Sequence, residues 1–223
     1  MVERVRTSFS DRRIAVVASL AILSLFVLAM IVARVLYTRT FDHAGIAWNL
    51  FLAWIPFMLA LVVYARARSG MSRPGLVALA GLWLLFFPNA PYIVTDLKHI
   101  GTSTGIPVLY DVLLLSAAAW TGLLLGLMSL FLMHAVARRA LGAVSAWALV
   151  VGVLAASSFG IYLGRVQRWN SWDVFVRPEA LLGQVANGFH AAPLALTVLL
   201  TSFLLASYLV FYSLARMSAV IRD

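Results

Sequence analysis

Residues that could bind a ligand gather in two short stretches of an otherwise apolar chain. They are Asn89, Tyr92 and Asp96 in the first stretch, and Arg165, Arg168 and Asp173 in the second. A guanidinium group flanked by aromatic rings is well suited to a phosphate or carboxylate, because its planar fork of N–H donors matches two oxygens at once. The residue types therefore predict a site for an anionic lipid headgroup or a small anionic solute.

The first stretch interrupts an apolar segment with two prolines, Pro88 and Pro91. Each proline lacks a backbone donor and its ring clashes with the preceding turn, so a regular helix cannot continue unbroken. Two interpretations stay open: a kinked helix whose end is capped by Asn89, and a broken helix that lines a cavity. Counting residues along the segment places the break in the outer third of the membrane, with Asp96 at the outer surface.

The second stretch, from Arg165 to Asp173, holds two Arg, two Trp, one Asn and one Asp within nine residues. Ser158, Tyr162, Arg165 and Trp169 recur at helical spacing and predict one stripe on a helix face. Arginines that snorkel and an interfacial belt of tryptophans are the alternative explanation. The cluster is denser than such a belt requires, which favours contact with a ligand.

The composition is that of a membrane protein. Hydrophobic residues make up 63% of the 223 residues and charged residues only 11%, against about 45–50% and about 25% in soluble domains. The chain has no cysteine, which excludes disulfides and thiolate sites. The net charge of +9 comes from short loops between apolar runs, so it indicates membrane topology and not a nucleic-acid partner.

The apolar runs predict an all-α membrane bundle of about six transmembrane helices, with the third span broken at Pro88–Pro91. The first run is longer than the core of a secretory signal, about 7–15 residues, and is expected to be retained. The predicted segments are a basic N-terminus 1–13, spans at about 14–36, 46–64, 75–94, 109–133, 145–164 and 192–214 within one domain 14–214, and a tail 215–223.

The charge distribution predicts the orientation of the bundle. Most of the 17 Lys and Arg residues fall on the side that holds both termini, and the positive-inside rule places that side in the cytoplasm. His134 is expected there, as an interfacial residue in a loop from His134 to Val144. Asp111 opens the fourth span, where a helix dipole favours an acidic residue.

Three functions remain open on the sequence alone. The first is binding or transport of the anionic group. The second is an enzyme acting on a lipid or lipid-linked phosphate at the outer face, with Asp96 or Asp111 as a general base. The third is a helical subunit that docks a partner and has no ligand site. No phosphate-binding loop, His-Glu-x-x-His or Gly-x-Ser-x-Gly motif supports a common enzymatic mechanism.

No metal or other cofactor is predicted. Asp96 and His99 are three residues apart and could form half of a metal site. A third ligand would have to come from Asp111 or from the Asp42–His43 pair, and no sequence spacing supplies it.

Two glycine pairs indicate close helix packing. Gly122 and Gly126 lie on the fourth predicted span, and Gly160 and Gly164 on the fifth. Small residues at this spacing let helix backbones approach each other. We expect them to pack helices within the bundle.

Several long runs of residues resemble the domain-of-unknown-function 1361 family of bacterial membrane proteins. The runs are Phe86–Leu97, Tyr110–Asp111, Gly160–Arg165 and Arg168–Asp173, and the resemblance extends from about Trp48 to Tyr212. It implies a multi-pass protein of the bacterial inner membrane. It implies no activity and assigns no site residues, so the candidates above come from residue chemistry alone.

Overall fold

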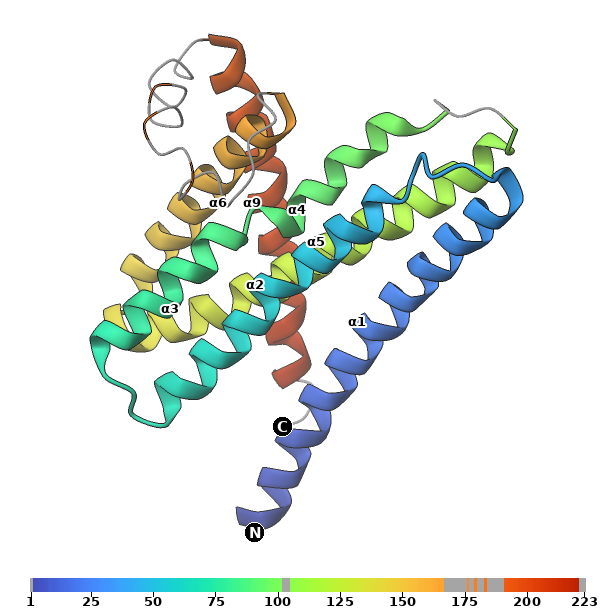
Figure 1. The fold of residues 1–223 in the computed structure, drawn as a ribbon. Helices are drawn as coiled ribbons and strands as arrows, with labels where there is room; N and C mark the ends of the chain where they lie inside the picture. The colour runs from blue at the N-terminus through green and yellow to red at the C-terminus, as the bar shows by residue number, and fades with distance from the viewer. Residues whose placement is uncertain are drawn as a thin grey trace.

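The computed structural model describes residues 2–101, 105–166, 176, 179, 183 and 191–220, and its secondary structure there is helical (Figure 1). The helices are α1 (Val2–Thr38), α2 (Gly45–Arg68), α3 (Arg73–Phe86), α4 (Asn89–Tyr92), the 3₁₀ helix η1 (Ile93–His99), α5 (Val108–Leu141), α6 (Ala143–Val166) and α9 (Ala191–Val220).

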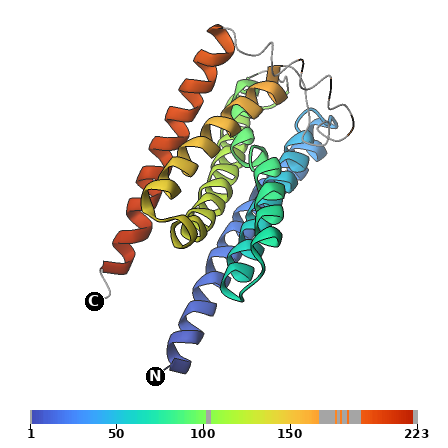
Figure 2. The same cartoon turned by 90° about the vertical axis from the view of Figure 1, so that its left-hand side faces the viewer.

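Six helical segments of the described chain are long and apolar enough to cross a membrane, with α3, α4 and η1 together forming the third. This confirms the predicted six-span helical bundle. Each predicted span lies within one helix or, for the third, within the stretch from α3 to η1. Helix α1 begins and α9 ends at the same end of the bundle (Figure 2). An even number of crossings requires this arrangement.

Helix α5 is the central element of the bundle. It packs against α1, α2, α4, η1 and α6. In its most apolar window 61% of the residues are buried, against 11% in α9, which lies at the periphery. The other helices are therefore positioned largely by their contacts with α5.

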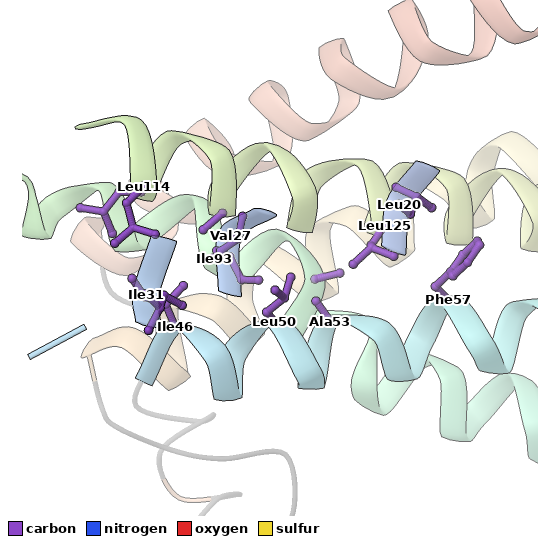
Figure 3. Close-up of a cluster of buried hydrophobic side chains, with 13 residues drawn as sticks. Leu20, Val27, Ile31, Ile46, Leu50, Ala53, Phe57, Ile93, Leu114 and Leu125 are labelled. Atoms are coloured by element: carbon purple, nitrogen blue, oxygen red, sulfur yellow. The ribbon is translucent and has the colours of Figure 1, made fainter. Parts of the chain in front are cut away.

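The main apolar core joins side chains from α1, α2, η1 and α5, including Val27, Leu50, Ile93 and Leu114 (Figure 3). Large apolar side chains such as Val198 on α9 remain exposed on the outer faces. Lipid tails are as apolar as these side chains, so exposure costs little in a bilayer and helix association depends on close packing instead.

The predicted loop from His134 to Val144 is wrong. Helix α5 continues to Leu141, and Gly142, with φ +85°, separates it from α6. The intervening residues are good helix formers, and the glycine is the first that readily adopts positive φ. His134 consequently lies inside α5 with only 2% of its surface exposed.

The break in the third span is a loss of hydrogen bonds with little change of backbone angles. Phe87 and Pro88 keep right-handed helical φ and ψ, but the prolines at 88 and 91 have no N–H to donate. The Asn89 side-chain amide donates to the carbonyl of Phe86 at 2.9 Å. Asn89 thus caps the end of α3, as one of the two interpretations expected.

The break sits against three of the four predicted packing glycines. A Cβ on Gly122 would lie 2.6 Å from the carbonyl oxygen of Ala90, and one on Gly126 would lie 3.3 Å from the Ala90 Cβ. On α6, a Cβ at Gly160 would lie 3.4 Å from the Pro88 ring. These glycines pack helices within the bundle, as expected, and allow the broken segment to approach α5 and α6.

We expect Gly122→Ala to destabilise the protein, because the added methyl would overlap a backbone oxygen that cannot rotate away. Overpacking of this kind costs about 1–3 kcal/mol. Gly152→Ala is the matched control, because a Cβ there meets nothing within 4 Å. Melting temperatures in detergent should fall for the first variant only; equal values for both would contradict the packing argument.

Candidate ligand-binding site

Arg165, near the end of α6, forms an ion pair with Asp96 on η1. Its Nη2 lies 2.5 Å from the Asp96 Oδ1, and the two side chains are 16% and 5% exposed. Its Nε donates to the Thr95 hydroxyl at 2.7 Å. One guanidinium group therefore connects the two stretches that the sequence singled out.

Tyr92 and Thr95 complete the surroundings of the guanidinium. The Arg165 Cζ lies 4.3 Å from the centre of the Tyr92 ring, within the range of a cation–π contact. The Thr95 hydroxyl donates to the Tyr92 carbonyl at 2.6 Å, which leaves its oxygen free to accept from Arg165. Residues 92, 95 and 96 can contact one side chain because α4 runs directly into η1. Residues three or four apart on such a helical segment lie on the same side.

Asn49 of α2 holds the other oxygen of the carboxylate. Its Nδ2 donates to the Asp96 Oδ2 at 3.0 Å. The structure buries Asp96 instead of placing it at the outer surface as predicted, whereas Lys98 and His99 are exposed. A carboxylate can be buried here because a guanidinium and an amide replace its hydration.

The six predicted binding residues have three different outcomes. The structure brings Tyr92, Asp96 and Arg165 together. It shows Asn89 hydrogen-bonded to the backbone at the end of α3. Arg168 and Asp173 lie outside the described residues, as does Trp169 of the predicted stripe.

Sequence reasoning missed Asn49 and Thr95 as parts of this site. Asn49 is a polar side chain at the start of an apolar helix, and such residues usually face a partner inside the bundle. That signal was present in the sequence. Nothing in the sequence indicated Asp96 as its partner, 47 positions away along the chain.

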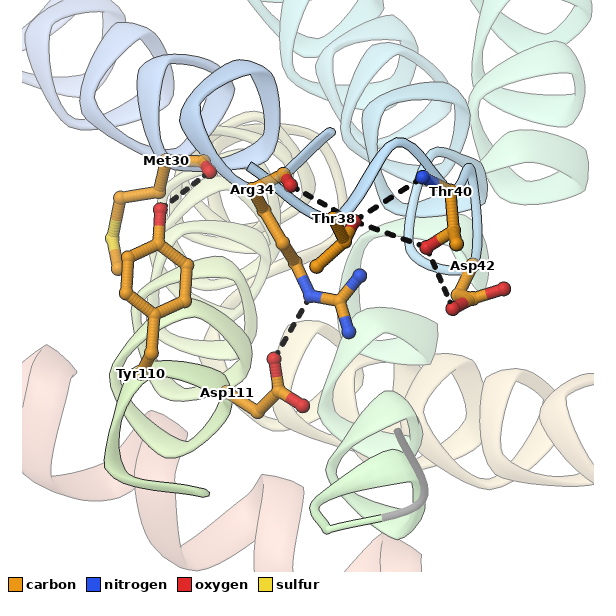
Figure 4. A network of polar contacts seen from close by, with 7 residues as sticks. All are labelled: Met30, Arg34, Thr38, Thr40, Asp42, Tyr110 and Asp111. Carbon is orange, nitrogen blue, oxygen red and sulfur yellow. Dashed lines mark hydrogen bonds and ion pairs between the residues drawn. The ribbon is translucent and has the colours of Figure 1, made fainter. Parts of the chain in front are cut away.

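A second ion pair joins α1 to the start of α5 (Figure 4). The Arg34 Nε lies 3.0 Å from the Asp111 Oδ1, and both side chains are 1% exposed. Beside it, the Tyr110 hydroxyl donates to the Met30 carbonyl at 2.6 Å. Asp111, expected to serve as a dipole partner or a base, thus has a buried cation as its partner.

The sequence contained a signal for Arg34 as well, because this charge falls near the end of the first apolar run. A charge in a span usually faces a partner inside the bundle.

His43, in the loop between α1 and α2, is buried near this second pair. Burial lowers the pKa of its imidazole, and the Arg34 charge lowers it further, against smaller raising effects from Asp111 and Asp42. The neighbouring His99 also lowers this pKa. The folded protein therefore favours the neutral form of His43 more than the unfolded chain does.

Among the described residues, no group of three or more His, Asp or Glu side chains is arranged to hold a metal ion. Asp96 and His99 gain no third ligand there. Both candidate carboxylates, Asp96 and Asp111, are hydrogen-bonded to arginine instead.

The fold and these contacts define a multi-pass helical membrane protein with two buried arginine–aspartate pairs. The family described as Protein of unknown function (DUF1361) matches residues 48–207, and the chain belongs to this family. The match confirms the resemblance seen in the sequence. It includes Asp96, Asp111 and Arg165, whereas Arg34 and His43 precede it. No curated protein and no solved structure matches the chain.

We expect Arg34→Met to be severely destabilising, because it leaves the Asp111 carboxylate buried without its cation. Removing one member of a buried pair costs about 3–5 kcal/mol. The double variant Arg34→Met/Asp111→Leu should recover most of this loss, since it removes both charges. Unfolding free energies of the two single variants and the double variant form the test; additive losses would contradict the pairing.

His43 should make the stability depend on pH. Its pKa in the folded state lies below the ordinary value of 6.5, so below about pH 6.5 the unfolded chain binds more protons than the folded one. Stability is then fully present above this pH and falls as the pH drops. His43→Gln should flatten that fall in melting temperatures measured between pH 5 and 8; an unchanged slope would contradict the prediction.

Proposed function

We propose that this protein binds an anionic group at Arg165, as a binding or transport protein for an anionic solute or lipid headgroup at the outer face of the membrane. The observation that carries the proposal is the contact of Arg165 with Asp96 across the broken third span. Discontinuous helices in transporters bring irregular backbone to the site where the substrate binds.

The contacts of Arg165 leave it able to receive an anion. Its side chain is more exposed than that of Asp96. Its hydrogen bonds to the described residues use Nε and Nη2, so Nη1 remains available for an oxygen of the ligand. An anion would then compete with the Asp96 carboxylate for the same guanidinium, with the Tyr92 ring beneath it.

The net charge of the Arg165–Asp96 pair limits how an anion can bind. The Arg165–Asp96 pair is neutral as a unit, and a singly charged anion would leave one net negative charge in a largely buried site. Such a charge is costly away from water. An anion at Arg165 would therefore bind with part of its charge still hydrated, on the exposed side of the guanidinium.

The local backbone favours a site that can rearrange. Helix η1 has seven residues in 3₁₀ geometry, longer than the usual three or four, and such stretches often mark hinges. The prolines before it remove helical hydrogen bonds. Asp96 therefore lies on a segment that can move relative to α3.

The same contacts speak against the enzyme alternative. A general base needs an oxygen within hydrogen-bond reach of the substrate proton. Both oxygens of Asp96 accept hydrogen bonds from Asn49 or Arg165, and Asp111 is buried against Arg34. The partner-subunit alternative requires no ligand at Arg165, and the experiment below distinguishes it.

Titration of the purified protein in lipid nanodiscs with inorganic phosphate and with short-chain phosphatidic acid, at one fixed pH, tests the proposal. We expect the parent protein to bind at least one of the two anions, through the Arg165 guanidinium. Asp96→Asn should strengthen binding, because it removes the carboxylate that competes with the anion for the Arg165 guanidinium.

Arg165→Gln should abolish binding, and Arg165→Lys should weaken it because lysine lacks the planar fork. Lys98→Gln is the matched control, since it removes a nearby cation that is exposed. If neither anion binds, or if Arg165→Gln binds as well as the parent protein, the anion site is absent and the partner-subunit alternative is favoured.

A further inference from the structure

A pocket of about 300 Å³ lies between α3, α5 and α6, in the half of the bundle near the two termini. Val77, Gly81 and Leu84 of α3 form one wall, Leu149 and Val153 of α6 form the other, and α5 forms the floor. Val77, Leu84 and Leu149 are also exposed on the outer surface. The pocket therefore opens sideways, toward the hydrocarbon of the membrane.

The floor of the pocket is apolar except for His134 of α5, whose ring nitrogens can donate or accept hydrogen bonds. Its Nδ1 is hydrogen-bonded to the Tyr208 hydroxyl at 2.7 Å, and its ring lies against those of Trp147 and Tyr212, at 4.7 and 5.3 Å between centres. Its Nε2 is buried and has no hydrogen-bond partner among the described residues. These contacts fix the imidazole with one polar atom unused.

The polarity of this pocket specifies the chemistry of its occupant. Apolar walls suit an alkyl chain. A buried nitrogen without a partner is costly and is usually paired in native structures. In the tautomer in which the Tyr208 hydroxyl donates to Nδ1, the Nε2–H is a donor and requires an acceptor on the occupant.

The position of His134 along α5 indicates where that acceptor lies. Arg138 follows four residues later, about 6 Å farther along the helix axis, and Arg139 and Arg73 are exposed at the same end of the bundle. Anionic lipid headgroups are attracted to basic residues at this level. The interfacial layer is only about 5–7 Å deep on each side, so His134 lies below the headgroup phosphate, near the ester linkages.

We propose that this pocket binds an anionic phospholipid of the adjoining leaflet. One acyl chain fills the space between α3 and α6, an ester carbonyl accepts a hydrogen bond from the His134 Nε2–H, and the phosphate lies among the arginines at that end. The site is separate from Arg165 and does not depend on the anion binding proposed there.

One glycine allows the pocket to be filled without disturbing the fold, and a second supplies the control. Gly81 lines the pocket, Gly152 is an exposed glycine on α6 outside it, and a Cβ at either position meets nothing within 4 Å. Gly81→Leu therefore occupies the space of the acyl chain, and Gly152→Leu is the matched control. Equal melting temperatures of the two variants in detergent would establish that both are folded.

Native mass spectrometry of the full chain, exchanged into detergent containing phosphatidylglycerol and phosphatidylcholine, measures the lipid retained. We expect the parent protein and Gly152→Leu to retain phosphatidylglycerol in preference to phosphatidylcholine. Gly81→Leu should retain at least about tenfold less phosphatidylglycerol than the parent protein. Undiminished retention by Gly81→Leu would overturn the pocket assignment, and equal retention of the two lipids would overturn the anionic preference.

Ether-linked phosphatidylglycerol tests the role of His134, because it lacks the ester carbonyls but keeps the same headgroup and chains. One net hydrogen bond corresponds to about two- to tenfold in binding, so the ester lipid should be retained that much better. Equal retention of ester and ether lipids would overturn the His134 contact.

Discussion

A charge inside a membrane must be paired within the protein, and this requirement determines how the helices of this bundle meet. Arg34 on α1 pairs with Asp111 at the start of α5, and Arg165 on α6 pairs with Asp96 on η1. Each pair joins segments that are about 70 or more positions apart in the chain. Because an unpaired charge would be far less stable in hydrocarbon, the pairs select one arrangement of helices that would otherwise pack with similar energies.

The proline break and the glycines of α5 and α6 make the second pair possible. Without side chains at Gly122 and Gly160, the segment around Pro88 lies directly against both helices. The 3₁₀ helix that follows then turns Asp96 toward the interior while Lys98 and His99 remain exposed. A continuous helix would retain every backbone hydrogen bond but would be less able to change shape around a ligand.

The two proposed sites lie in different halves of the bundle and share the central helix. The Arg165 site is polar, its carboxylate and guanidinium satisfy each other, and ligand binding there means exchange of partners. The His134 pocket is apolar with one unused nitrogen, and ligand binding there adds a partner. A site whose groups already pair with each other suits a ligand that exchanges readily, whereas a site with an unpaired nitrogen suits a lipid that stays bound.

The sequence by itself determined the six spans and the break at Pro88–Pro91, and it singled out Tyr92, Asp96 and Arg165 as candidates, because hydrophobic length, proline geometry and the cost of charge are local properties. Only the tertiary structure decided which charges pair. The sequence did not single out Arg34 and placed His134 in a loop, since a sequence shows that a polar side chain needs a partner but does not show which distant helix supplies it. Asn49 and Thr95 entered the site for the same reason. Their partners, Asp96 and Arg165, are neighbours in space but lie 47 and 70 positions away along the chain.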